Sequence, residues 1–182
     1  NAPILLIYRP EDFPNPKKSL GILRELAHSA GFNGLYIAAV SSFGTFDPRD
    51  VGADSIVEFP PLGTHHAASV PKPSDTHKDF HGHFYNYGLA AEHSTRMRHQ
   101  GFYVHRGVMP GWDNTPRRQN DSTIFLDATP EIFQAWLAHH LKWTSENNRT
   151  SATHPPVAGR HPRLDVHRAP ARPAPRGRLD RR

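Results

Sequence analysis

One loop of the sequence gathers side chains of four chemical kinds that together suit sugar recognition. Between Gly107 and Arg118, two glycines and two prolines fix turns and interrupt both helix and strand. The loop also carries an indole, a carboxylate, an amide and two guanidinium groups, from Trp112, Asp113, Asn114, Arg117 and Arg118. Pyranose C–H faces stack on an indole while the polar groups reach the hydroxyls, so the loop indicates a carbohydrate contact. A turn anchored by a buried Trp is the alternative.

Three further candidates lie where predicted strands end. Tyr8 and Arg9 close an apolar run over residues 4–8, and Glu58 lies inside another apolar segment. A buried carboxylate is costly unless it is paired. Glu58 therefore indicates either a substrate contact or a buried ion pair with Arg9 or Arg106. Tyr8 and Arg9 indicate either a substrate contact or an ordinary strand exit with a solvated Arg.

The charged candidates suggest two kinds of chemistry. Arg117 and Arg118 suit a phosphate or a sugar carboxylate, which a guanidinium holds through paired hydrogen bonds, with a solvated pair as the alternative. Glycoside hydrolysis needs two carboxyl groups about 5–10 Å apart. Glu58 and Asp113 are the candidate acids for that reaction.

Neither a metal nor a cofactor is expected. His77, His81 and His83 lie close in sequence beside Asp79, with His65-His66 upstream, but their spacing fits no familiar zinc pattern. The chain has no cysteine, which excludes disulfides, thiolate metal sites and Cys nucleophiles. It also lacks a glycine-rich nucleotide-binding loop and a DxD motif.

Alternating strands and helices position these residues. Short apolar runs predict strands over residues 4–8, 35–40, 55–59, 102–105 and 123–126. Helical periodicity predicts helices over 19–31 and 87–99, and another that opens at Thr129-Pro130-Glu131. Residues 62–85 show no period and are expected to form a long loop. This alternation is typical of an α/β fold with a parallel sheet.

Several stretches, in order, resemble the WbsX-like glycosyltransferase family. They are residues 4–10, 26–36, 57–61 and 129–137, together with the Trp112 loop. This family resembles the glycoside hydrolase family 99 domain, which implies a (β/α)8 TIM-type barrel, incomplete in a chain of this length. The resemblance also implies a polysaccharide or oligosaccharide substrate. The family's acid-bearing Asn-Glu-Trp-type motif is absent after residue 150, so catalysis by this chain is not expected.

The C-terminal segment differs in composition from the rest. Residues 151–182 hold eight of the 22 Lys and Arg residues but only two of the 17 acidic ones, so residues 1–150 are almost neutral. We expect a barrel domain over 1–150 and a disordered Arg/Pro-rich tail over 151–182. The tail has the composition of a GC-rich gene read out of frame. A functional basic tail that binds a polyanion is the alternative.

The sequence predicts a carbohydrate-active protein of bacterial surface polysaccharide (lipopolysaccharide or O-antigen) biosynthesis, glycosyltransferase- or glycoside hydrolase-like, and a truncated copy. A non-catalytic glycan-binding remnant is the alternative, and a polyanion binder is a weaker one. No specific nucleic-acid partner and no transmembrane segment are expected, because no run of eighteen apolar residues occurs. Cytoplasmic location is expected, and the oligomeric state is left open.

Overall fold

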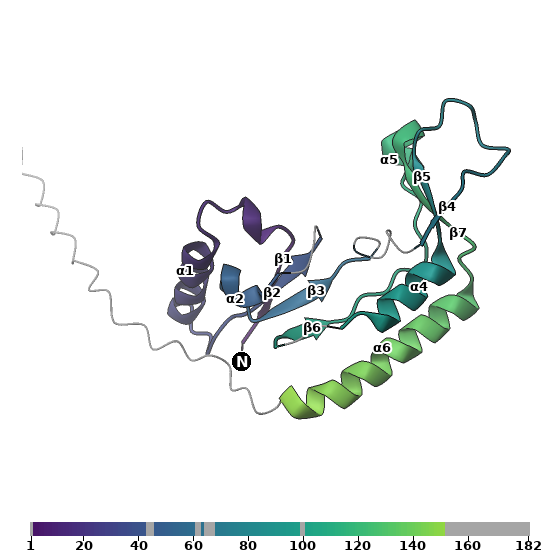
Figure 1. Ribbon diagram of the computed structural model, residues 1–182. Helices are drawn as coiled ribbons and strands as arrows, with labels where there is room; N and C mark the ends of the chain where they lie inside the picture. The colour runs from purple at the N-terminus through teal and green to yellow at the C-terminus, as the bar shows by residue number, and fades with distance from the viewer. Residues whose placement is uncertain (1, 43–45, 61–62, 64–67, 99–100, 152–182) are drawn as a thin grey trace, which may run out of the picture.

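A parallel four-stranded sheet forms the first half of the fold. The computed structural model describes residues 2–42, 46–60, 63, 68–98 and 101–151, with side chains to residue 147 (Figure 1). Strands β1 (Ile4–Ile7), β2 (Tyr36–Ser41), β3 (Ser55–Glu58) and β6 (Tyr103–His105) lie in the order β1-β2-β3-β6. All three pairings are parallel, which confirms the predicted α/β class. Within the described residues this sheet is open, so the barrel stays a prediction.

Helix α1 (Pro16–Ser29) covers one face of this sheet (Figure 1). The helix begins three residues before the predicted start because Asn15 caps it, accepting a hydrogen bond from the Lys18 amide at 3.1 Å. Gly31, at φ +90°, suits the expected C-terminal stop. Leu20 is fully buried and packs with apolar side chains of β2, β3 and β6. The short helix α2 (Pro48–Val51) and the 3-10 turn η1 (Pro10–Asp12) complete this half.

A second, smaller sheet lies in the segment that was expected to be a loop. Strand β4 (Ser69–Val70) pairs antiparallel with β5 (His83–Asn86), which pairs parallel with β7 (Thr123–Leu126). The loop prediction over 62–85 was therefore wrong for β4 and for the start of β5. These strands are too short to show a period and depend on pairing with β7, which is remote in sequence. Figure 1 shows this sheet projecting away from the four-stranded one.

Two helices run side by side and lead to the second sheet (Figure 1). Helix α4 (Tyr87–Arg96) begins where β5 ends, and the Asn86 side chain accepts from the Leu89 amide at 2.9 Å. Helix α6 (Pro130–Ser151) has the predicted opening, with Thr129 accepting from the Ile132 amide at 3.3 Å. Trp136 and Tyr87 join the two helices in an edge-to-face contact. The predicted tail, from residue 152 on, lies outside the described residues.

Candidate functional site

The Trp112 loop is held against β7 by backbone pairing. The Phe125 amide donates to the Trp112 carbonyl at 2.8 Å, and Asp113 forms an antiparallel bridge with Ile124. The Asn114 side chain accepts from the Thr123 amide at 2.7 Å. The loop thus extends the second sheet beyond β7. Hydrogen bonds to β7 therefore fix its position, in addition to the glycines and prolines that form its turns.

The side chains of this loop divide into structural and exposed groups. Trp112 is half-buried and packs against the core cluster that contains Phe125, so the indole anchors the loop while part of it stays accessible. Its Nε1 is buried and has no hydrogen-bond partner among the described residues. The Asp113 carboxylate accepts from the Thr115 amide at 2.8 Å and the Thr115 hydroxyl at 2.7 Å, which fixes the start of α5 (Thr115–Arg118). Arg117 and Arg118 are exposed. The structure shows no hydrogen bond or ion pair of their side chains to the residues that it describes.

Glu58 lies in a buried ion pair with Arg106. This was one of the two predictions for Glu58, and the other was a substrate contact. One carboxylate oxygen is 3.0 Å from Nη1 of Arg106, and the two side chains are only 9% and 2% exposed. The other oxygen accepts from the Gly107 amide at 3.0 Å. Gly107 allows this approach, because a Cβ there would lie 2.6 Å from the Glu58 carbonyl. Glu58 therefore ties the end of β3 to the end of β6.

Arg106 also connects this ion pair to helices α4 and α6. Its guanidinium donates to the Ser94 carbonyl of α4 and lies 5.2 Å from the ring centroid of Trp143 on α6. Burial lowers the pKa of Arg106, and the Glu58 carboxylate acts in the opposite direction. The pair is thus enclosed between the four-stranded sheet and the two helices, and its packing is that of a structural contact.

A buried polar group outside the predicted site residues lies next to Arg106. The Trp136 indole donates to Nε2 of His140 at 2.8 Å, and the Ser94 hydroxyl lies 3.1 Å from the same nitrogen. His140 is 3% exposed. Burial and then the nearby Arg106 lower the pKa of His140 to about 4. Since Nε2 accepts, the neutral ring carries its proton on Nδ1. Among the described residues, that buried nitrogen has no partner.

Tyr8 and Arg9, at the end of β1, have different surroundings. Tyr8 is 48% exposed and meets Phe59 edge-to-face, with ring centroids 5.4 Å apart. This contact bridges the exits of β1 and β3 over β2. Arg9 pairs with Asp12 at 3.1 Å and Glu11 at 3.6 Å, within the η1 turn. Tyr8 thus lies at the carboxyl edge of the sheet, whereas Arg9 belongs to a surface turn.

The predicted site residues therefore fall into separate places. Glu58 and Tyr8 belong to the four-stranded sheet, whereas the five residues of the Trp112 loop belong to the second sheet. The side chains of His77 and Asp79 meet at 3.6 Å on the surface. His65 and His66 lie outside the described residues. No group of three metal-ligating side chains occurs in the part of the chain that the structure describes.

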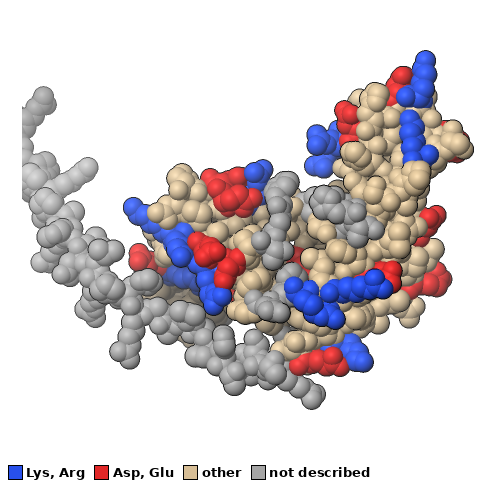
Figure 2. All heavy atoms as spheres, in the orientation of Figure 1, with Lys and Arg blue, Asp and Glu red and all other residues tan. Residues whose placement is uncertain are grey.

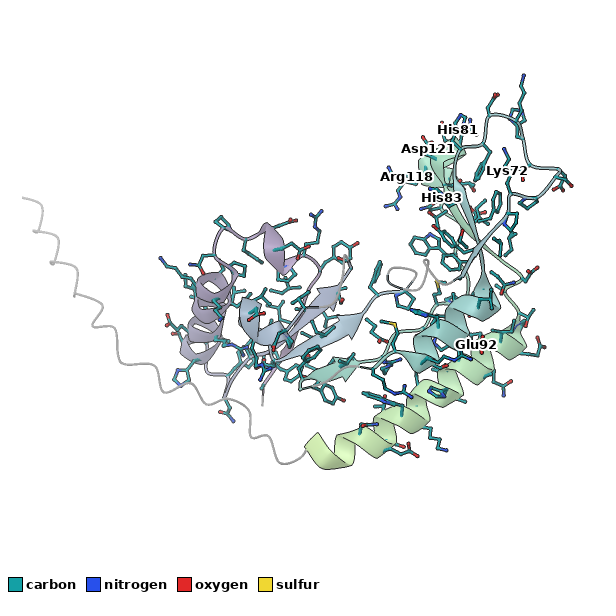
Figure 3. All side chains as sticks on the ribbon, in the orientation of Figure 1. Lys72, His81, His83, Glu92, Arg118 and Asp121 are labelled. Atoms are coloured by element: carbon teal, nitrogen blue, oxygen red, sulfur yellow. The ribbon has the colours of Figure 1, made fainter. Side chains whose placement is uncertain are left out.

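The tip of the second sheet adds polar groups that sequence reasoning did not connect with Trp112. Figure 3 shows His81, His83, Arg118 and Asp121 together on the side of this sheet that faces the four-stranded sheet, with Lys72 on the other side. Alternation over His81, His83 and Tyr85 is the signal that could have placed these rings on one strand face.

Comparison with known proteins places the sequence in a family. Residues 1–154 match the family described as Glycosyltransferase WbsX. The chain belongs to this WbsX family. Membership confirms the resemblance that the ordered motifs indicated.

Two curated relatives come from Xanthomonas campestris pv. campestris, strains B100 and ATCC 33913. Both are named "Uncharacterized protein WxcX", and each is 33% identical to this WbsX-family chain over 142 residues. The match covers 78% of this chain but 20% of each relative, so the chain spans about a fifth of their length. No solved structure matches the chain. None of the described helices has the length and hydropathy needed to cross a membrane.

Proposed function

We propose that this chain is the carbohydrate-binding part of a glycosyltransferase- or glycoside hydrolase-like protein that acts in bacterial surface polysaccharide biosynthesis, of the lipopolysaccharide or O-antigen kind. Family membership over residues 1–154 supports a carbohydrate ligand. The observation that carries the proposal is the Trp112 loop, which fixes a partly exposed indole against β7 beside two arginines whose side chains have no partner among the described residues. Such a rigid aromatic with adaptable polar neighbours suits a sugar ring.

The sheet topology supports the fold that this function implies. Parallel strands in the order β1-β2-β3-β6 follow the chain order, with each new strand added beside the last. Consecutive addition in one direction is how a (β/α)8 barrel is built, whereas a doubly wound sheet reverses direction. We therefore propose that these strands correspond to part of a barrel wall. The active-site edge would then be the carboxyl edge, where Tyr8 and Glu58 lie.

We further propose that the chain by itself binds sugar without turnover. Glu58 is neutralised by Arg106 and enclosed, and the Asp113 carboxylate accepts from the Thr115 amide at the start of α5. Neither carboxylate is placed to act as a free acid or nucleophile. The non-catalytic alternative is thus favoured by two specific contacts. Transferase and hydrolase chemistry of the longer protein both remain compatible with it.

The proposal is tested by calorimetric titration with O-chain oligosaccharides from Xanthomonas campestris lipopolysaccharide. We expect dissociation constants near the millimolar level, about −4 kcal/mol, and loss of binding in Trp112→Ala. Thermal melting of the variant separates lost binding from lost folding. Phe102→Ala, on the other core cluster, is the control for a general loss of packing. Binding that survives Trp112→Ala in a folded protein would refute the proposal.

We also propose, from charge alone, that residues 151–182 bind polyanions. The eight arginines of this segment predict salt-sensitive retention on heparin. Deleting 151–182 should abolish that retention and leave the oligosaccharide titration unchanged. Such a result would assign the two interactions to different parts of the chain.

A further inference from the structure

The second sheet carries a continuous row of rings on the face that Trp112 shares. Tyr85 stacks on Phe125 at a centroid distance of 5.1 Å, and His83 lies 6.4 Å from Tyr85. Trp112 packs against the same cluster from the neighbouring edge. The buried end of this row is apolar, and His83 at its other end is exposed. The row thus runs from the core to the tip of the sheet.

Backbone contacts fix the polar groups at that tip. The His81 amide donates to the Asn120 carbonyl at 2.7 Å, and the His83 amide donates to the Ser122 carbonyl at 2.8 Å. Between them, a Cβ at Gly82 would lie 2.0 Å from the Ser122 carbonyl. Only glycine permits this approach. The close contact therefore places both imidazoles on the face of the ring row, beside the turn that carries Arg118 and Asp121.

The side chains of the polar residues at this tip form no hydrogen bond or ion pair with the described residues. His81, His83, Arg118 and Asp121 are all exposed, and the structure shows no ion pair between Asp121 and any of the other three. Figure 3 places all four on one side of the sheet, and Figure 2 shows a basic side chain projecting there beside an acidic one. Exposed polar groups that lie on one side of the sheet and do not pair with one another are available to a ligand.

We propose that the tip formed by His81, His83 and Arg118 is a subsite for a carboxylate-bearing sugar. This sugar would be the neighbour, in the glycan, of the sugar ring that stacks on Trp112. Arg118 would hold the carboxylate, and the imidazole N–H groups would donate to it or to ring hydroxyls. Asp121 would accept from a hydroxyl. A carboxylate beside Arg118 disfavours a dense polyanion such as nucleic acid, whereas it suits a sugar that presents both a carboxylate and hydroxyls.

This inference rests on the proposed glycan binding and names the class of glycan. It is tested with an oligogalacturonate and the same oligosaccharide after its carboxyl groups are reduced to alcohols. We expect the wild-type chain to bind the acidic form about three- to tenfold more tightly, an advantage of about 1 kcal/mol, as found for exposed ion pairs. The preference should shrink as salt is raised, because exposed charges are screened.

Substitution distinguishes the tip from other basic residues. Arg118→Gln and the double variant His81→Gln/His83→Gln should each remove most of the preference for the acidic form. Binding of the reduced form should remain within about twofold. Arg96→Gln is the matched control, because it removes an exposed guanidinium from α4, whose residue Glu92 lies far from the tip in Figure 3. Melting curves of all variants show whether the fold is kept.

Two outcomes separate failure of this inference from failure of the proposed function. Equal, Trp112-dependent binding of both oligosaccharides would overturn the acidic subsite and leave glycan binding intact. No binding of either form would overturn both. A preference that survives Arg118→Gln and the double histidine variant, but is lost in Arg96→Gln, would place the anion site elsewhere and also overturn the inference.

Discussion

At the scale of single residues, the most consequential assignment concerns Glu58. From the sequence, a carboxylate in an apolar strand indicated either a substrate contact or an ion pair. The structure places it 3.0 Å from Arg106, with both side chains almost fully enclosed. The sequence could state these two options, because burial of a carboxylate requires a partner. It could not choose between them, since Arg106 lies on a distant strand.

The ion pair leads to a stability prediction. Glu58→Gln leaves the Arg106 charge enclosed without its counter-ion and should lower the free energy of unfolding by about 3–5 kcal/mol. Glu92→Gln, which breaks an exposed ion pair with Arg96 on α4, should cost less than about 1 kcal/mol. Urea unfolding of both variants measures the difference. Equal losses of unfolding free energy in the two variants would contradict a buried Glu58–Arg106 ion pair.

His140 predicts a dependence of stability on pH. Its pKa in the folded protein is about 4, below the ordinary value of 6.5. The unfolded chain therefore takes up the proton first as pH falls, and stability should decline between about pH 6.5 and 4, by at most about 3 kcal/mol. Urea unfolding of wild type and His140→Gln across this range isolates the contribution. His139→Gln, at the exposed neighbour, should leave the decline unchanged. A decline that persists in His140→Gln would contradict the assignment.

At the scale of elements, local signals located some structures and missed others. Thr129 and Pro130 open α6 as predicted, because capping depends on neighbouring residues. Helix α1 begins three residues before its predicted start, because Asn15 caps it ahead of the first apolar residue of the helix. Strand β4 and the start of β5 were not predicted, because residues 62–85 show no periodicity. These strands form through the pairing of β4 with β5 and of β5 with β7. The Trp112 loop was recognised by its residues, but its attachment to β7 depends on tertiary contacts.

Two glycine substitutions test the close contact that holds the second sheet. Gly82→Ala would place a methyl group 2.0 Å from the Ser122 carbonyl, so β5 and the 120–122 turn must separate. We expect a loss of more than about 3 kcal/mol, as for severe overpacking. Gly21→Ala, inside α1 with open space at its Cβ, should instead gain about 0.5–1 kcal/mol. A Gly82→Ala protein as stable as wild type would show that this contact is not required.

At the scale of the whole molecule, two sheets share a layer of helices. The ring row and the Trp112 loop belong to the second sheet, whereas the Glu58–Arg106 pair joins the first sheet to α4 and α6. The sequence predicted the parallel α/β class, because strands and helices alternate visibly. It could not predict the division into two sheets. As a result, the candidate site residues lie on different sheets.

The central claim, that sugar binds at Trp112, is tested most directly by following the three tryptophan indole N–H signals by NMR. In a titration with the O-chain oligosaccharides, the Trp112 signal should shift in a saturable way. The signals of Trp136, which is buried against Ser94 and His140, and of Trp143, which lies against Arg106, should stay in place. Saturable shifts of Trp136 or Trp143 with none at Trp112, or no shift at all, would contradict the account.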